Sequence, residues 1–198
     1  MFYDMIPMGG PALILVDIQK GFGDITYWGG QRNNPDAELR CGELLSLWRA
    51  HGLPICHIQH CSILSASPLH ASNAGNAFQD IVAPRAGEVV FRKNVNSAFI
   101  GTDLQVWLDR AGIRKLVIAG LTTDHCISTT ARMSGNLGFE TFIVADATAT
   151  FNKTGVDGQH YSAELIHDTA LASLSREFAQ VVTSEWIAHE MANTQSLI

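Results

Sequence analysis

The sequence has little charge and few cysteines. Lysine and arginine together number 13 against 19 acidic residues, and the resulting net charge of −6 disfavours nucleic acid or an anionic membrane surface as the main partner. The four cysteines form no C-x-x-C pair and are too few for a disulfide scaffold. The longest early apolar run, residues 12–16, is too short for a signal peptide or a membrane span. We therefore expect a cytoplasmic protein in a reducing compartment.

Apolar residues are abundant. They make up 46% of the 198 residues, against 16% charged residues, which is typical of a folded protein with a large core. The chain contains no internal repeat, low-complexity tract or linker. We therefore expect a single domain over residues 1–198.

Short apolar segments alternate with helical patterns along the whole chain. This alternation predicts an α/β fold, namely a doubly wound, Rossmann-like, six-stranded and mostly parallel sheet with helices on both faces. Two long segments, 19–35 and 61–87, interrupt the pattern, and loops of that length are usually functional. The expected strands are 12–17, 54–60, 88–93, 115–119, 140–145 and 180–183, and the expected helices are 36–51, 104–111, 125–137, 160–178 and 185–191.

Cys126 follows the apolar strand at 115–119, the turn residue Gly120 and the N-cap types Thr122 to Asp124. This order places the thiol in the first turn of a helix that starts at the carboxyl end of a strand. Free backbone N–H groups and the positive helix end meet there, and both stabilise a thiolate or an oxyanion. We expect the pKa of the thiol to lie below its usual value of about 8.5.

Asp17 and Lys93 also stand at the ends of predicted strands. Ligands of open α/β sheets bind outside the carboxyl ends of the strands, so these two residues and Cys126 are expected to face one crevice. Taken alone, each has an ordinary structural explanation: Cys126 as a small core residue, Asp17 as a turn former and Lys93 as a solvated side chain. Together they suit amide hydrolysis, in which a thiolate attacks, a carboxylate moves protons and an ammonium stabilises both charges.

The ordered motifs resemble those of the isochorismatase-like cysteine hydrolase family, in its amidohydrolase branch related to N-carbamoylsarcosine amidase and nicotinamidase. The resemblance extends over about residues 12–178 and is specific for the superfamily but not for a substrate. It is carried by Leu-Val-Asp17-Ile-Gln19, by Lys93 followed by Ser97-Ala-Phe99, by Gly101-Thr-Asp-Leu104 and by Gly120-Leu-Thr-Thr-Asp-His-Cys126.

The resemblance implies a role for each residue. Asp17 is the general base, Lys93 the charge-stabilising partner and Cys126 the nucleophile, while the N–H groups of Thr122 and Cys126 form an oxyanion hole. It also implies a cis peptide between Leu121 and Thr122. Isochorismatases proper cleave a vinyl ether and lack the cysteine, so Cys126 favours hydrolysis of C–N bonds. No organic cofactor is implied.

Three histidines raise the question of a metal. Nicotinamidases have an Asp-x-His site, but the matching stretch here is His57-Ile-Gln-His60, which lacks the carboxylate ligand. On a strand, positions 57 and 60 point to opposite faces. We therefore expect no metal at His57, His60 and His70, with His57 packed in the sheet and His60 facing the crevice to contact substrate.

The other expected substrate contacts are aromatic. Phe22 and Trp28 from the first long loop and Phe151 after the fifth strand are candidates for the pocket wall, with Arg32 beside Trp28. Trp28 and Arg32 fit equally well with packing against the sheet edge or a neighbouring subunit. The second long loop, 61–87, is expected to act as a lid.

These residues favour a cysteine-dependent hydrolase of a small carboxamide, carbamoyl or ureido compound that works through a thioester. One alternative is a non-catalytic or redox-sensing binding protein on the same fold. A weaker alternative is an ether hydrolase that uses Asp17 alone. We expect a small-molecule substrate and a homo-oligomer, either a dimer or a tetramer.

Overall fold

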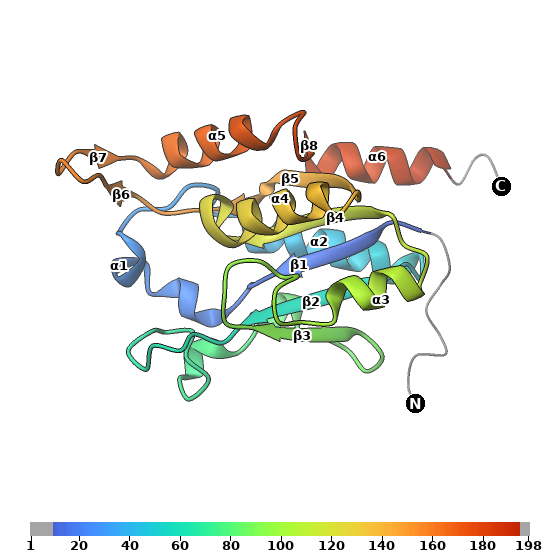
Figure 1. The fold of residues 1–198 in the computed structure, drawn as a ribbon, viewed down its shortest axis with the longest axis horizontal. Coiled ribbons are helices and arrows are strands. Elements are labelled where there is room, and N and C mark those ends of the chain that lie inside the picture. Colours follow the sequence, from blue (N-terminus) through green and yellow to red (C-terminus); the bar gives the residue numbers. More distant parts are fainter. Residues whose placement is uncertain (1–9, 195–198) are drawn as a thin grey trace.

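A six-stranded parallel sheet forms the centre of the computed structural model, which describes residues 10–194 (Figure 1). Its order is β3-β2-β1-β4-β5-β8. The predicted α/β fold is therefore confirmed, and every strand pair in this sheet is parallel. The strands are β1 (Ala12–Val16), β2 (Ile55–His60), β3 (Val89–Lys93), β4 (Lys115–Leu121), β5 (Glu140–Ala149) and β8 (Gln180–Val182).

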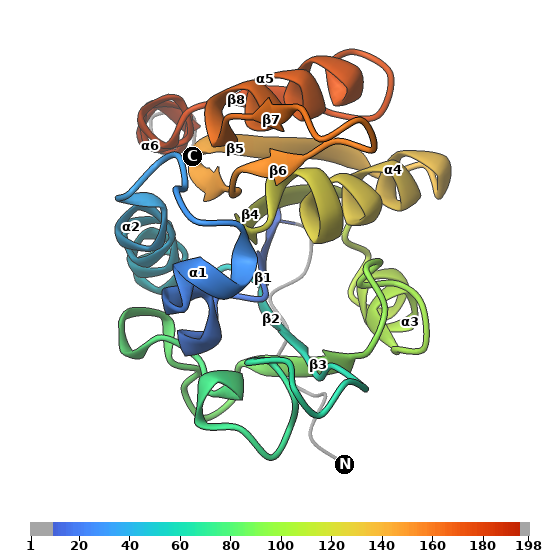
Figure 2. The same ribbon diagram turned by 90° about the vertical axis from the view of Figure 1, so that its left-hand side faces the viewer.

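Helices cover both faces of the sheet (Figure 2). Alternate residues of β1 face opposite sides, so Leu13 and Leu15 pack with one helical layer and Ile14 and Val16 with the other. The first layer consists of α2 (Ala37–Ala50) and α6 (Ser184–Thr194), and the second of α3 (Leu104–Arg110), α4 (Ser128–Asn136) and α5 (Ala163–Leu174). No helix within residues 10–194 is long and apolar enough to cross a membrane.

The two long loops contain short helices and pack against each other at the carboxyl edge of the sheet. The first contains η1 (Lys20–Gly23) and α1 (Ile25–Trp28), and the second contains η2 (Ala74–Asn76) and η3 (Asp80–Val82). The Lys20 N–H donates to the Ala77 carbonyl at 2.8 Å, and the Gln79 N–H donates to the Ile18 carbonyl at 3.0 Å. The segment expected to act as a lid is thus hydrogen-bonded to the loop that follows β1.

The predicted helix at 160–178 is too long at both ends. Its first two residues form β7 (His160–Tyr161), which pairs with β6 (Lys153–Thr154) in a hairpin. The helix α5 begins after Ser162, whose hydroxyl accepts a hydrogen bond from the Leu165 N–H at 3.2 Å, as an N-cap does. The chain then leaves the helix through Arg176, which has a φ of +73°. The hairpin and N-cap at one end and the turn at Arg176 at the other therefore set the limits of α5, although the spacing of the apolar residues predicted a longer helix.

Candidate active site

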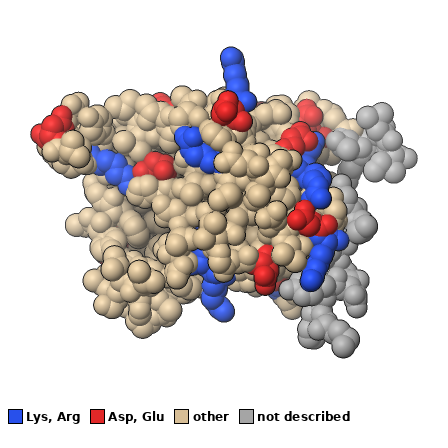
Figure 3. All heavy atoms as spheres, in the orientation of Figure 1, with Lys and Arg blue, Asp and Glu red and all other residues tan. Residues whose placement is uncertain are grey.

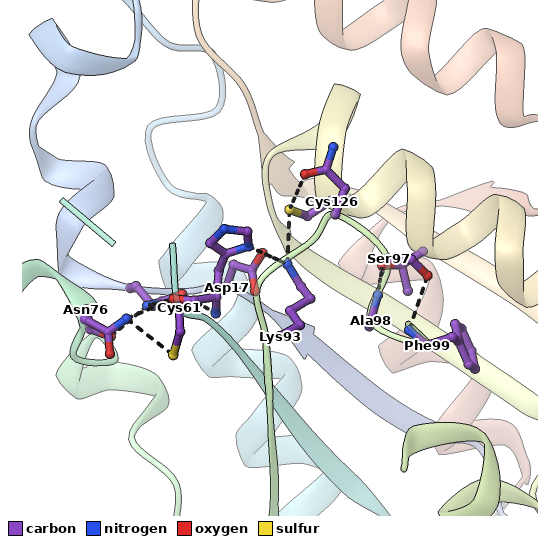
Figure 4. A network of polar contacts seen from close by, with 12 residues as sticks. Asp17, Cys61, Asn76, Lys93, Ser97, Ala98, Phe99 and Cys126 are labelled. Carbon is purple, nitrogen blue, oxygen red and sulfur yellow. Dashed lines mark hydrogen bonds and ion pairs between the residues drawn. The ribbon is translucent and has the colours of Figure 1, made fainter. Parts of the chain in front are cut away.

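The ammonium of Lys93 joins the predicted residues into one cluster (Figure 4). Its Nζ donates to Asp17 Oδ2 at 2.5 Å, to His60 Nδ1 at 3.1 Å and to Cys126 Sγ at 3.2 Å. Asp17, Lys93 and Cys126 are all buried. An ammonium has three N–H donors, so each of them has a partner here.

Strand register explains why these residues meet. Asp17 follows the last residue of β1, while His60 and Lys93 end β2 and β3 and lie opposite each other in the register of that pair. β1 also pairs with β4, which leads to Cys126. If the six strands of the sheet are numbered by their order along the chain, so that β8 counts as the sixth, they lie in the order 3-2-1-4-5-6. The crevice of such a sheet lies where the order reverses, between β1 and β4. The cluster therefore lies at that point.

Asp17 has an unusual backbone conformation. Its φ is +54°, in the left-handed region that costs a residue with a Cβ about 1–2 kcal/mol. The Asp17 N–H donates to the Ile58 carbonyl at 2.9 Å, and the Gln19 N–H donates to the Asp17 carbonyl at 2.9 Å. These bonds hold the strained residue at the end of β1. Such strain is concentrated at functional sites, which agrees with the location of the cluster.

Cys126 lies in a π-helical turn, Thr123–Ile127, that precedes α4. Cys126 thus lies in the first turn of the helical segment, as predicted, and this turn is wider than an α-helical one because the Ile127 N–H reaches back to the Thr122 carbonyl at 3.1 Å. The cis peptide between Leu121 and Thr122 is confirmed. Gly120 has a φ of +129°, and a Cβ there would lie 2.0 Å from the Val16 carbonyl oxygen, so only glycine permits this approach of β4 to β1.

The electrostatics of the thiol differ from expectation. Burial and the neighbouring Asp17 raise the pKa of Cys126, and Lys93 opposes them only in part. This direction is opposite to the predicted lowering, because the loss of water on burial, which the prediction did not include, adds to the expected opposition of Asp17 and outweighs Lys93. Burial also acts against the charge on Lys93, but Asp17 and Cys126 hold the pKa of Lys93 above its usual value. The resting cluster thus contains a thiol beside an ammonium–carboxylate pair.

The two oxygens of Asp17 have different surroundings. Oδ2 accepts from Lys93, whereas Oδ1 is buried and has no hydrogen-bond partner among the described residues. One carboxylate oxygen of Asp17, one ring nitrogen of His60 and Cys126 Sγ lie within 4.8 Å of one another. A buried carboxylate that lies near a thiol and has one unpaired oxygen is suited to take the thiol proton.

The predicted aromatic contacts pack with one another. The ring centroids of Phe22 and Trp28 are 4.7 Å apart, and both lie 6.2 Å from the ring of Phe151. Phe22 and Phe151 are buried in the core, so Trp28 alone of the three has appreciable exposed surface. Arg32 forms an ion pair with Glu38 at 2.8 Å and lies over Phe151. Their role as a substrate wall stays a prediction.

Sequence reasoning missed Asn96. Its Oδ1 lies 3.9 Å from Cys126 Sγ, although the residue itself is exposed. Asn96 belongs to the motif that follows Lys93, but nothing in its residue type pointed to the thiol. Gln19 and Asn76 were also not assigned, and both form hydrogen bonds to the main chain of His60.

The histidines do not converge on a metal site. His57 is buried on the opposite face from His60, and its Nε2 lies 2.9 Å from Glu88, while His70 Nδ1 pairs with Ser72 on the surface at 2.7 Å. The set Asp17, His60 and Cys126 has suitable ligand atoms, but the Lys93 ammonium binds all three. These residues therefore do not fit a metal ion while Lys93 carries its charge.

We expect hydrolysis to survive exhaustive chelation, because the Lys93 ammonium fills the position that a cation would need. The measurement is turnover after dialysis against EDTA and 1,10-phenanthroline, with metal content checked by mass spectrometry. Loss of turnover that Zn²⁺, Mn²⁺ or Fe²⁺ restores would contradict this prediction and make His60 a ligand.

Comparison with known proteins agrees with this geometry. The family model of the isochorismatase domain matches residues 11–186. The chain belongs to the isochorismatase family. Within this hydrolase family it is 45% identical over 183 residues to the uncharacterised protein YrdC of Bacillus subtilis, covering 92% of this chain and 97% of that one.

Two further relatives extend the comparison. A crystal structure of a family protein from Chromobacterium violaceum superposes with a TM-score of 0.89 at 40% identity, covering 96% of this chain and 97% of that one. Maleamate amidohydrolase of Pseudomonas putida is 28% identical over 196 residues, covering 88% of this chain and 84% of that protein.

Proposed function

We propose that this isochorismatase-family hydrolase cleaves a C–N bond in a small carboxamide, carbamoyl or ureido compound through a thioester on Cys126. The observation that carries the proposal is the buried Lys93 ammonium, which bridges a carboxylate and a thiol at 2.5 and 3.2 Å. A nucleophile, a proton acceptor and a fixed positive charge are what acyl transfer requires. The similarity to maleamate amidohydrolase supports C–N hydrolysis.

The first step forms the C–S bond. Because the pKa of Cys126 is raised, the sulfur carries its proton at rest and must lose it as it attacks. The unpaired Asp17 Oδ1 accepts that proton while Sγ adds to the substrate carbonyl carbon. The carbonyl π electrons move to oxygen, and the N–H groups of Thr122 and Cys126 are the proposed donors to this oxyanion. Lys93 stays protonated and keeps the remaining charges paired.

The second step breaks the C–N bond. The oxyanion re-forms the carbonyl, the C–N electron pair returns to nitrogen, and Asp17 gives its proton to the departing ammonia or amine. A water molecule then attacks the thioester and transfers a proton to Asp17. Collapse of this second intermediate breaks the C–S bond, and the proton returns from Asp17 to the sulfur. The enzyme is thereby restored with no cofactor consumed.

The raised pKa of Cys126 does not favour the alternative of a redox sensor. Oxidation to a sulfenate proceeds from the thiolate, and sensor cysteines are accessible with a lowered pKa. Cys126 is 8% exposed, and both burial and Asp17 raise its pKa. The local environment thus supports proton transfer during attack more than it supports reaction with an oxidant.

A panel of primary amides and ureides, assayed by ammonia release, is expected to yield at least one substrate. Rapid quenching should show an added acyl mass on the Cys126 peptide and none on the peptides of Cys41 and Cys56, both buried cysteines of the same chain. Ammonia release without an adduct on Cys126 would contradict the thioester, and cleavage of a vinyl ether in place of amides would contradict the bond specificity.

A further inference from the structure

Two uncharged polar side chains flank the Cys126 thiol and take no part in the proton transfers described above. His60 Nδ1 lies 3.1 Å from Lys93 Nζ, and Asn96 Oδ1 lies 3.9 Å from Cys126 Sγ. We propose that His60 and Asn96 recognise the substrate beside its scissile bond, and that the group they contact is an uncharged amide or ureide. This inference rests on the proposed function and names the substrate class of the same site.

Lys93 fixes the tautomer of His60. An ammonium only donates hydrogen bonds, so His60 Nδ1 must accept and the ring proton must be on Nε2. Burial and the charge of Lys93 lower the pKa of His60, which keeps the ring neutral. Within residues 10–194, Nε2 has no hydrogen-bond partner, yet it is not a fully buried atom. The ring therefore offers a neutral N–H donor to a ligand.

Two buried side chains hold His60 in place. Gln19 Oε1 accepts from the His60 N–H at 2.8 Å, and Gln19 Nε2 donates to the His60 carbonyl at 3.0 Å. Asn76 Nδ2 donates to the same carbonyl at 2.9 Å. Both main-chain polar groups of His60 are thus bound by side chains from the two long loops. A donor held in this way is preorganised, which favours specific recognition.

Asn96 is positioned by the residues that follow it. The Ala98 N–H donates to Thr130 Oγ1 of α4 at 3.1 Å, and the Phe99 N–H donates to Ser97 Oγ at 3.2 Å (Figure 4). The loop is therefore tied to the helix that begins just after Cys126. Asn96 Nδ2 has no partner among the described residues, so the side chain presents a donor and an acceptor beside the thiol.

The charges at the carboxyl edge argue against an anionic substrate. In the described part of the chain, Lys93 and three loop cations at this edge pair with carboxylates, and Arg92, which precedes Lys93 on β3, donates to the amide oxygen of Gln59 at 3.0 Å. Uncharged side chains cover most of the left-hand end of Figure 3, where the strands end. A substrate carboxylate would be desolvated there, while these cations are already bound to groups of the protein. The loop pairs are Lys20–Asp80 at 2.8 Å, Arg32–Glu38 at 2.8 Å and Lys153–Asp124 at 3.4 Å.

The test compares succinamide with succinamate, in which a carboxylate replaces the distal amide. Both compounds are assayed as substrates and as competitors of the best amide in the panel. The native enzyme is expected to have at least about tenfold higher kcat/KM, or tenfold tighter competition, with succinamide. Asn96→Asp keeps the shape but replaces a donor by a charge, so it should lower kcat/KM for the uncharged amide about tenfold. Asn94→Asp adds the same charge in the same exposed loop and should leave kcat/KM unchanged.

The role of His60 in substrate recognition is tested with two variants whose side-chain amides extend to different distances from the backbone. A glutamine amide can extend to the position of Nε2, whereas an asparagine amide reaches only that of Nδ1. We expect His60→Gln to retain most of the kcat/KM and His60→Asn to raise KM at least about fivefold, with similar melting temperatures. Equal kinetics of the two variants would overturn the role assigned to His60.

The result that overturns the whole inference is equal or better use of succinamate together with no effect of Asn96→Asp. In that case the acyl adduct on Cys126 would still form, so the proposed function would stand. If the proposed function itself were wrong, the result would differ, because no amide would then acylate Cys126 in the native enzyme or in any variant.

Discussion

Cys126→Ala is expected to abolish amide hydrolysis, with kcat falling by at least about 10⁴-fold, because no other group can form the thioester. The substitution removes one sulfur and leaves Lys93 bound to Asp17 and His60. We expect a loss of stability of only about 1 kcal/mol, typical of a single buried substitution. The measurement is turnover of the best amide in the panel, with thermal unfolding followed in parallel.

Cys56→Ala is the matched control for this change. Cys56 is another buried free cysteine and belongs to the same side of the core as Cys126. Its substitution removes the same atom from the same layer and should leave kcat within about twofold of the native value, since its sulfur has no role in the mechanism. If the Cys126→Ala enzyme retained near-native turnover, the thioester would be excluded and hydrolysis by Asp17 alone would be the better explanation.

The sequence was sufficient to predict where Asp17, Lys93 and Cys126 lie, because each stands at the end of a short strand or a few residues after it. In a parallel sheet all such positions are at one edge, so topology alone brings them together. The same reasoning predicted that His60 faces them and His57 does not, since the alternation of side chains along a strand is fixed. These features depend on local pattern and on the direction of the strands.

Other features depend on contacts between distant segments, and local patterns do not reveal them. Asn96 lies beside the thiol because its loop is tied to α4 through Thr130, 32 residues away from Ala98. The pKa of Cys126 is set by burial and by Asp17 more than by the local helical turn. The start of α5 was misplaced because the hairpin of β6 and β7 extends to Tyr161, immediately before the N-cap Ser162.

Asp17→Asn is expected to slow amide hydrolysis while making the Cys126 thiol more reactive toward an alkylating agent. Hydrolysis should fall by about 10²–10⁴-fold, because the amide cannot accept the thiol proton or return it to the leaving nitrogen. Alkylation of Cys126 by iodoacetamide should become faster at neutral pH. Asp17 is one of the groups that raise the pKa of Cys126, so removing its charge lowers that pKa and increases the thiolate fraction.

The buried ion pair makes stability the main concern with this variant. Removing the carboxylate leaves Lys93, which is 3% exposed, without its counter-charge, and breaking such a pair costs about 3–5 kcal/mol. Assays should therefore be run well below the melting temperature of the variant. Asp109→Asn is the control, since it removes a carboxylate from an exposed ion pair with Arg114 and should change neither rate.

The decisive measurement is the pH dependence of Cys126 alkylation, read by peptide mass spectrometry, beside turnover on the same samples. In the native enzyme the alkylation rate should rise only above about pH 8, because the thiol has a raised pKa. In the Asp17→Asn enzyme the profile should shift to lower pH while hydrolysis is nearly lost. Slower alkylation together with lost turnover would mean that Asp17 stabilises the thiolate or the fold rather than taking the thiol proton. Unchanged turnover would show that another group is the base.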